Sequence, residues 1–235
     1  MTARYQRILL KLSGEGLSSP EKTIDPAILE KIATEIKAVL AEGVQVCLVL
    51  GAGNIFRGMA GAANGMDRTT ADYMGMLATV INGLALQDAL RRNGITAHVQ
   101  SAIPAPTVCE EVVRHDAISY LNQGHVVIFV AGTGNPYFTT DTAAVLRALE
   151  MNCHAVLKST SVDGVYTADP KKDPKAKFLP TVSYADCLDK SLRVMDMTAI
   201  ALARDSKLPI IVFNQTVPGL LKEIVLGKGK CSLIS

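Results

Sequence analysis

Three glycine-rich segments with charged or hydroxyl neighbours follow short apolar runs, at residues 11–14, 51–54 and 132–134. Glycine lets backbone N–H groups approach a ligand closely, and loops of this kind hold anions, especially beside a helix N-terminus. Lys11 and Lys158 each stand at the end of an apolar run, where burial of an ammonium group is costly without an anion. The pattern predicts a phosphate-binding site.

Four charged side chains accompany these segments: Lys11, Arg57, Asp141 and Lys158. Each has a structural alternative, because a buried lysine can pair with a carboxylate, an arginine can lie on the surface, and an aspartate can cap a helix. Together they favour phosphoryl transfer, which depends on positioning and charge stabilisation rather than on a strong base. None of the four histidines lies in these segments, so histidine-centred acid–base catalysis has no support.

Two common nucleotide-binding fingerprints are not met. In the dinucleotide-binding pattern GxGxxG, Phe56 and Tyr137 occupy the position of the third glycine after Gly51 and Gly132. The Gly227–Lys230 segment lacks both the spacing and the hydroxyl residue of a Walker A loop. These departures argue against a nicotinamide dehydrogenase and a P-loop kinase.

Short apolar runs alternate with amphipathic segments along the chain, which predicts an α/β fold: a three-layer αβα sandwich with a central, mainly parallel sheet. We expect strands at 8–12, 44–50, 95–100, 125–131, 155–158 and 208–213, and helices at 26–40, 72–92, 110–122 and 142–151. No internal repeat or long linker divides the chain, so residues 1–235 are expected to form a single domain. The polar segment 169–180 is either a solvated surface loop or a loop beside the active site. Ligands of such a sheet bind beyond the carboxyl ends of its strands.

Composition excludes several classes of protein. The 235 residues are 49% apolar, and 24 basic against 22 acidic side chains give a net charge of +2, too small to attract nucleic acid or an acidic membrane. The five cysteines form no CxxC pair, which argues against a zinc knuckle or a thioredoxin motif. No apolar run approaches the ~18 residues of a membrane span, and the N-terminus has no signal-peptide pattern. A cytoplasmic protein is expected.

Several motifs, in order and along essentially the whole chain, resemble the bacterial UMP kinase (uridylate kinase) family of the amino-acid kinase superfamily. They are Lys11-Leu-Ser-Gly-Glu15, Gly51-Ala-Gly-Asn54 with Phe56-Arg-Gly58, Met74-Gly-Met-Leu-Ala-Thr79, Thr133-Gly-Asn-Pro-Tyr-Phe-Thr-Thr-Asp141, Val162-Asp-Gly-Val-Tyr-Thr-Ala-Asp-Pro170 and Leu202-Ala-Arg-Asp205. The resemblance implies the amino-acid kinase fold and transfer of the γ-phosphoryl group of MgATP to UMP, giving UDP and ADP. It also implies a homohexamer, feedback inhibition by UTP, and Mg²⁺ that arrives with ATP rather than on protein ligands.

The resemblance also implies roles for individual residues. Lys11, Arg57, Asp141 and Lys158 would be catalytic, with Asp141 orienting either the lysines or the magnesium, and Asp196 would assist. Asp72 would accept hydrogen bonds from the ribose hydroxyls of UMP, and Tyr166 would lie against the adenine base. Residues from about 150 to 235 would mainly bind ATP, and the N-terminal part would bind UMP and form oligomer contacts. The full ATP set would be Lys11, Leu12, Ser13, Gly14, Gly53, Arg57, Thr160, Tyr166 and Asp169; the full UMP set would be Ala52, Asp72, Thr133, Gly134, Asn135, Pro136, Tyr137, Phe138, Thr139 and Thr140.

Two positions depart from the family pattern. Ala52 stands where many relatives have glycine, and its methyl group is tolerable only if its φ is negative. Residues 18–23 lack the glycines of the segment associated with GTP activation, so GTP activation through this segment is not supported. Two alternatives stay open: a non-catalytic nucleotide-binding or storage protein on the same fold, and a kinase acting on carbamate or an amino-acid carboxylate.

Overall fold

A nine-stranded sheet forms the centre of the computed structural model, which describes residues 3–56, 65–189, 192 and 194–235. Its strands lie in the order β4 (Glu110–Glu111), β3 (Ala97–Ser101), β5 (Val126–Val130), β2 (Gln45–Leu50), β1 (Arg7–Leu12), β6 (Ala155–Thr160), β10 (Ile210–Asn214), β11 (Ser232–Ile234) and β9 (Thr181–Val182). Neighbouring strands are parallel except for β10 and β11, which are antiparallel. The predicted, mainly parallel sheet is therefore confirmed.

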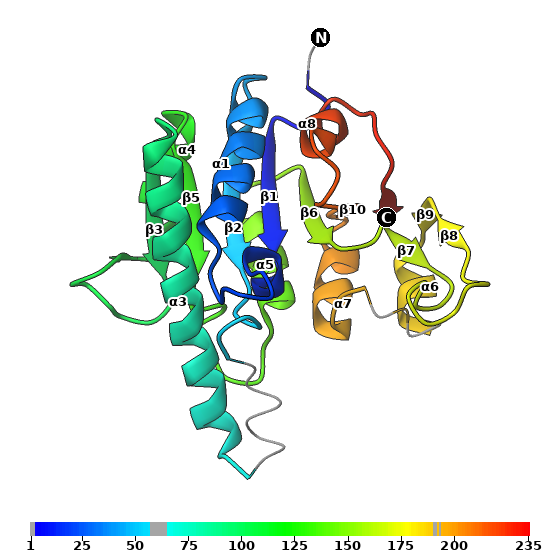
Figure 1. Ribbon diagram of the computed structural model, residues 1–235, viewed down its shortest axis with the longest axis horizontal. Helices are drawn as coiled ribbons and strands as arrows, with labels where there is room; N and C mark the ends of the chain where they lie inside the picture. Colours follow the sequence, from blue (N-terminus) through cyan, green and yellow to red (C-terminus); the bar gives the residue numbers. More distant parts are fainter. Residues whose placement is uncertain (1–2, 57–64, 190–191, 193) are drawn as a thin grey trace.

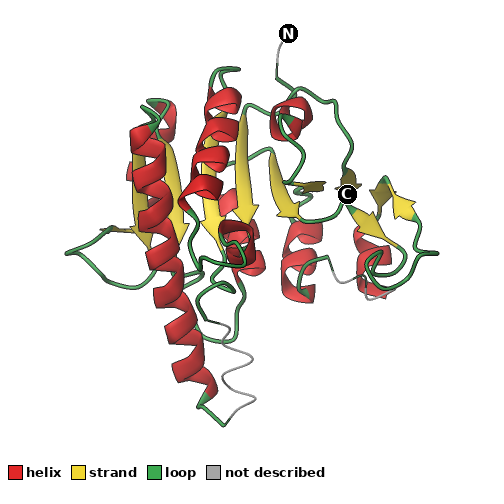
Figure 2. Ribbon diagram, viewed as in Figure 1, coloured by secondary structure: helices red, strands yellow, loops and turns green. Residues whose placement is uncertain are grey.

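Helices cover both faces of the sheet (Figures 1 and 2). One face packs against α1 (Pro26–Leu40), α3 (Arg68–Arg92) and α8 (Leu220–Val225); the other packs against α4 (Arg114–Asn122), α5 (Thr140–Glu150), α6 (Tyr184–Asp189) and α7 (Met197–Asp205). Alternation along the strands produces these two cores: Ile8 and Leu10 of β1 enter the first, and Leu9 enters the second. No helix of the described residues is long and apolar enough to cross a membrane.

Local signals explain where several helices begin. Asp25 caps α1 by accepting a hydrogen bond from the Ala27 N–H at 2.9 Å, and Pro26 follows at the first helical position, as predicted. Helix α3 begins four residues before the predicted start, because Asp67 accepts the Thr70 N–H at 2.9 Å. The prediction of a helix from residue 110 was wrong: Glu110 and Glu111 form β4 beside β3, and α4 begins at Arg114.

The segment 169–180 lies largely in the connection of a separate small hairpin formed by β7 (Val165–Tyr166) and β8 (Phe178–Leu179). The short elements β7, β8, β9, β11, α6 and α8, and the nine-residue α7, were not predicted. Most of these elements are too short to show a hydrophobic period, so tertiary contacts decide their conformation.

The chain reverses its direction of travel across the sheet at β1. From β1 it proceeds through β2 to β3 and β5 on one side, and α5 then returns it to β6 on the other side of β1. In Figure 1 the strands β1, β2, β5 and β6 all point toward the same edge, and α3 extends past that edge. Open α/β sheets bind ligands at such a reversal, beyond the carboxyl ends of the strands.

Candidate active site

Lys11, Asp141 and Lys158 form a buried charged cluster at this reversal. Lys11 on β1 and Lys158 on β6 are register partners, so the sheet itself places them side by side. The Nζ atoms of Lys11 and Lys158 lie 2.8 and 2.7 Å from the two carboxylate oxygens of Asp141, which belongs to the first turn of α5. The side chain of Lys11 is 9% exposed, that of Lys158 is 13% exposed and that of Asp141 is 14% exposed. Three predicted catalytic residues thus meet at one point.

The cluster carries an excess positive charge. Burial opposes ionisation of Asp141, but the adjacent charges of Lys11 and Lys158 outweigh it and lower the pKa of this carboxyl group. Burial also lowers the pKa of Lys158; Asp141 opposes this shift, and the like charge of Lys11 adds to it. Two ammonium groups around one carboxylate, beside the N-terminus of α5, favour a further anion such as a phosphoryl group.

Asp196 links the N-terminal ends of α5 and α7. As the N-cap of α7 it accepts the Ala199 N–H at 2.9 Å, and its carboxylate also accepts the hydroxyl groups of Thr139 and Thr142. The Thr139 hydroxyl in turn caps α5 by accepting the Asp141 N–H at 3.0 Å. Asp196 thus helps to fix the turn that carries Asp141.

The first two glycine-rich loops pack directly against each other. The loop after β1 enters a short 3₁₀-helix, η1 (Gly14–Leu17), which Ser13 caps by accepting the Gly16 N–H at 3.2 Å. A Cβ atom at Gly14 would lie 2.5 Å from the backbone nitrogen of Gly53, so only glycine permits this approach. Ala52 is not among the described non-glycine residues with positive φ, and its methyl group therefore causes no left-handed strain.

Two buried polar residues of α3 hold the second and third glycine-rich loops. Asn82, which is fully buried, donates to the Gly51 carbonyl at 2.8 Å and to Asn54 Oδ1 at 2.9 Å. The Thr79 hydroxyl accepts the Ala131 N–H at 2.7 Å. Neither contact was predicted from the sequence. The sequence signal for these contacts was that Thr79 and Asn82 are polar residues three positions apart in a long predicted helix that also carries core residues.

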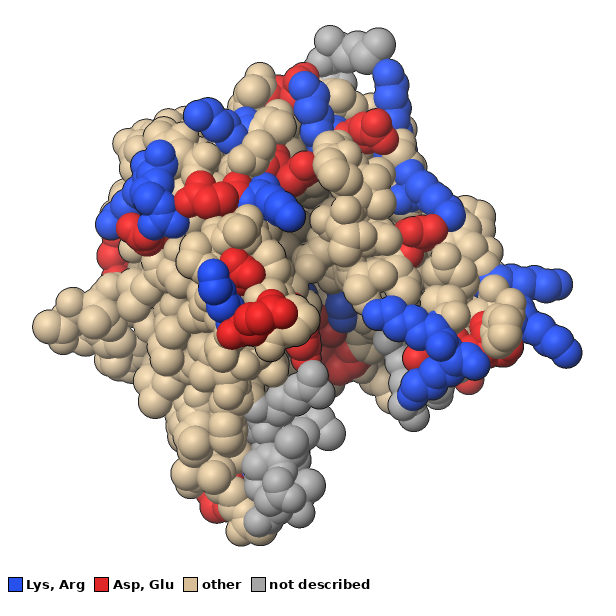
Figure 3. Space-filling model, viewed as in Figure 1, with Lys and Arg blue, Asp and Glu red and all other residues tan. Residues whose placement is uncertain are grey.

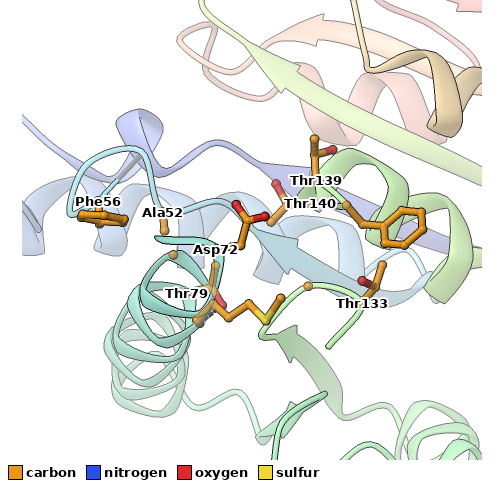
Figure 4. A pocket seen from close by; sticks show the side chains of 11 residues that line it. Ala52, Phe56, Asp72, Thr79, Thr133, Thr139 and Thr140 are labelled. Carbon is orange, nitrogen blue, oxygen red and sulfur yellow. Dashed lines mark hydrogen bonds between the residues drawn. The ribbon is translucent and has the colours of Figure 1, made fainter. Parts of the chain in front are cut away.

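A cavity of about 140 Å³ lies between α3, the loop after β2 and the loop before α5. Figure 4 shows Asp72 at its centre, between Ala52 and Thr140. Its lining includes six residues of the predicted UMP set: Ala52, Asp72, Thr133, Phe138, Thr139 and Thr140. Sequence reasoning missed Phe56, Gly75, Met76, Thr79 and Gly132, which complete the lining. Gly134, Asn135, Pro136 and Tyr137 belong to the same loop but do not line the cavity.

The residues predicted for adenosine lie on the other side of β1. The Thr160 hydroxyl, at the end of β6, donates to the Val162 carbonyl at 2.6 Å, and Asp169 accepts the Lys171 N–H at 3.0 Å. The Tyr166 ring contacts Phe178 edge-on, with 5.6 Å between centroids. These contacts order the loop after β6 and its hairpin. Arg57, predicted to contact phosphate, lies outside the described residues.

The site and the topology together define a class of protein. Residues 6–214 match the model of the amino acid kinase family, and the chain belongs to that family. A uridylate kinase from Paramagnetospirillum magneticum (strain ATCC 700264 / AMB-1) is 54% identical over 234 residues, covering 99% of this chain and 98% of that protein.

Solved structures give the same relationship. The crystal structure of UMP kinase from Bacillus anthracis has a TM-score of 0.94 at 40% identity and covers 98% of this chain and 96% of its own. The UMP kinase from Ureaplasma parvum has a TM-score of 0.92 at 38% identity, with 99% of each chain covered. These similarities confirm the predicted amino-acid kinase fold.

Proposed function

We propose that this protein is a UMP kinase, which transfers the γ-phosphoryl group of MgATP to UMP in pyrimidine nucleotide synthesis. The observation that carries the proposal is the buried Lys11–Asp141–Lys158 cluster at the sheet reversal. A cavity lined by a carboxylate and hydroxyl groups lies on one side of this point. Nearly full-length similarity to a protein named uridylate kinase supports UMP as the acceptor.

In the proposed reaction, an oxygen of the UMP phosphate bonds to the γ-phosphorus of ATP as the bond to the β,γ-bridging oxygen breaks, and UDP and ADP form. The attacking oxygen is already anionic, so no strong base is needed. Lys11 and Lys158 stabilise negative charge on the transferred group, and Asp141 holds the two ammonium groups in place. N–H groups at the start of α5 add positive potential at the same point.

The acceptor nucleotide is assigned to the cavity and the loop before α5. Asp72 accepts the ribose hydroxyls, while Ala52 and residues 133–140 surround the uridine and its phosphate. Hydroxyl and backbone groups of this loop match the donor and acceptors on the imide edge of uracil. The chain reversal at β1 supports this assignment, because the strands on the cavity side of β1 are separate from those that lead to the β7–β8 hairpin.

The donor nucleotide is assigned to residues 11–14 and Gly53 for the phosphates and to Thr160, Tyr166 and Asp169 for the adenosine. ATP would bring Mg²⁺ with it, and the ion would supply positive charge that neutralises the phosphates. The carboxylates of Asp141 and Asp196 already pair with lysines and threonines, which fits a metal held chiefly by phosphate oxygens. The roles of Arg57 and of residues 150–235 as the mainly ATP-binding part belong to the same proposal.

Assembly and regulation complete the proposal: a cytoplasmic homohexamer inhibited by UTP. Tyr73, Leu77 and Ile81 on α3 are 42, 53 and 51% exposed, and burial against another copy would remove this apolar surface from water. Acidic and basic side chains are interspersed on the face shown in Figure 3, which fits small nucleotide ligands rather than a nucleic acid. Sedimentation of the purified protein tests the assembly.

An ADP-release assay tests the function, with ATP and Mg²⁺ supplied alongside UMP, CMP, dUMP, carbamate or acetylglutamate in separate reactions. We expect rapid ADP release with UMP and much slower ADP release with each of the other acceptors. Binding of ATP without ADP release would instead indicate a storage protein. Preference for carbamate or acetylglutamate would indicate a kinase for those carboxylates. Either result would overturn the proposal.

A further inference from the structure

Arg68 makes a two-oxygen contact with Asp72 at the start of α3. Its Nε atom lies 3.0 Å from Oδ1 and 2.8 Å from Oδ2 of Asp72, one helical turn further along. The side chain of Asp72 is 12% exposed, whereas that of Arg68 is 34% exposed. Arg68 therefore contacts the cavity carboxylate from its solvent side and does not line the cavity.

Asp72 and Arg68 also contact the loop that closes the other side of the cavity. The backbone N–H of Tyr137 donates to Asp72 Oδ2 at 2.8 Å. The guanidinium carbon of Arg68 lies 5.2 Å from the centroid of the Tyr137 ring, which is a cation–π distance. Tyr137 adopts a φ of 72°, a conformation unusual for a side chain of this size. Arg68, Asp72 and Tyr137 thus connect α3 to the loop before α5.

Helix stability does not explain Arg68 at this position. A cation in the first turn of a helix faces the positive end of the helix dipole. The order in which the cation precedes the carboxylate by four residues is also the less favourable of the two possible orders. The contact between Arg68 and Asp72 therefore contributes little to the stability of α3 as an isolated helix. Its main effect is to hold the Asp72 carboxylate in place.

An ionised carboxylate has about four acceptor positions. Arg68 and the Tyr137 N–H do not use all of these positions on Asp72, and the Asp72 carboxylate lies in the cavity between Ala52 and Thr140 (Figure 4). A ribose offers two adjacent hydroxyl donors, while a 2′-deoxyribose offers one. A fixed carboxylate gains both hydrogen bonds only from the ribose, whereas a carboxylate free to rotate loses this geometric discrimination.

We propose that Arg68 is a positioning residue that sets the preference of the acceptor site for a ribonucleotide over a deoxyribonucleotide. It acts through Asp72, by fixing the orientation of that carboxylate toward the two ribose hydroxyls. The inference rests on the proposed function, because it requires UMP to occupy the cavity beside Asp72. It adds a selectivity role for a side chain that does not itself touch the nucleotide.

The test compares Arg68→Ala and Arg68→Lys with the wild type, using kcat and KM for UMP, dUMP and ATP. We expect Arg68→Ala to raise the KM for UMP about tenfold. This is the usual scale for the loss of one hydrogen bond to a charged group, here a ribose hydroxyl to the Asp72 carboxylate. The KM for ATP should stay within about twofold, and the ratio of kcat/KM for UMP to that for dUMP should fall about tenfold. Arg68→Lys restores the charge without the planar group and should recover only part of the ratio.

Arg92→Ala is the matched control. Arg92 lies at the opposite end of α3 and pairs with the exposed side chains of Glu30 and Asp88. It should leave the UMP-to-dUMP ratio unchanged. Calorimetric titration of each variant with UMP and with dUMP, without ATP, gives the same comparison as binding constants and does not depend on turnover.

The outcomes separate the two proposals. A wild-type protein that releases no ADP with UMP overturns the proposed function. An active wild type whose UMP-to-dUMP ratio is unaltered in both Arg68 variants overturns this inference alone, as does an equal rise in KM for UMP and ATP. If Arg68→Ala fails to fold, Arg68→Lys decides: a ratio equal to that of the wild type rejects the role of the planar guanidinium.

Discussion

Asp141→Asn isolates the charge at the centre of the lysine cluster, because asparagine keeps the shape of aspartate. In the wild type, one carboxylate lies 2.8 and 2.7 Å from two ammonium groups, and none of the three side chains is more than 14% exposed. The substitution leaves two neighbouring lysines without their counter-charge. Removal of one partner from a buried ion pair costs about 3–5 kcal/mol. At about 2–4 °C per kcal/mol for a chain of this size, the lower limit corresponds to a fall in Tm of about 6–12 °C.

Thermal unfolding in phosphate-free buffer at pH 7 measures this loss, with Asp88→Asn as the control. Asp88 also pairs with an arginine, but its side chain is 67% exposed, so its replacement should move Tm by no more than about 2 °C. The ADP-release assay should show kcat for Asp141→Asn lower by about 10²–10³-fold. A Tm within about 2 °C of the wild type would refute the idea that Asp141 balances the buried lysine charges.

The pH dependence follows from the direction of the pKa shift. The folded-state pKa of Asp141 is depressed: burial opposes ionisation, but the two lysine charges outweigh it. The stabilisation is therefore fully present above the unfolded value of about 3.9 and is lost as pH falls through the lower folded value. The Tm difference between the wild type and Asp141→Asn should accordingly narrow below about pH 4. A constant difference from pH 7 to pH 3 would contradict this assignment.

Three further substitutions test other parts of the site. Lys11→Ala should lower kcat by about 10²–10³-fold, because it removes a charge that stabilises the transferred group; near wild-type turnover in the ADP-release assay would exclude this role. Asp72→Asn should raise the KM for UMP far more than the KM for ATP. Equal changes in the two KM values would contradict the assignment of Asp72 to the UMP site. Thr79→Val keeps the side-chain shape but leaves the buried Ala131 N–H without its 2.7 Å partner, so urea unfolding should show a loss of about 1–3 kcal/mol. An unchanged urea midpoint would show that this contact contributes little to stability.

Much of the fold could be predicted because its strands are continuous apolar runs. Ile8 to Leu12 and Val126 to Val130 are buried on both sides, and such runs identify inner strands of a parallel sheet. The short strand β4 could not be predicted in this way: Glu110 and Glu111 are exposed acidic residues, and only their pairing with Gln100 and Ser101 of β3 makes them a strand.

The sequence by itself determined the residue types of the site, with Lys11 and Lys158 at the ends of apolar runs and Asp141 at the start of a helix. It placed Lys11, Asp141 and Lys158 in separate segments, and the family resemblance implied the roles proposed for them. Only the tertiary structure decided that Lys11 and Lys158 are register partners and that one carboxylate contacts both. It also decided that Thr79 and Asn82 of α3 hold two glycine-rich loops and that Arg68 holds Asp72. Local sequence patterns report the periodicity of one segment, whereas these contacts depend on the relative placement of segments distant in the chain. The near-neutral net charge of +2 is consistent with this outcome, because a few converging groups create the local field of the site.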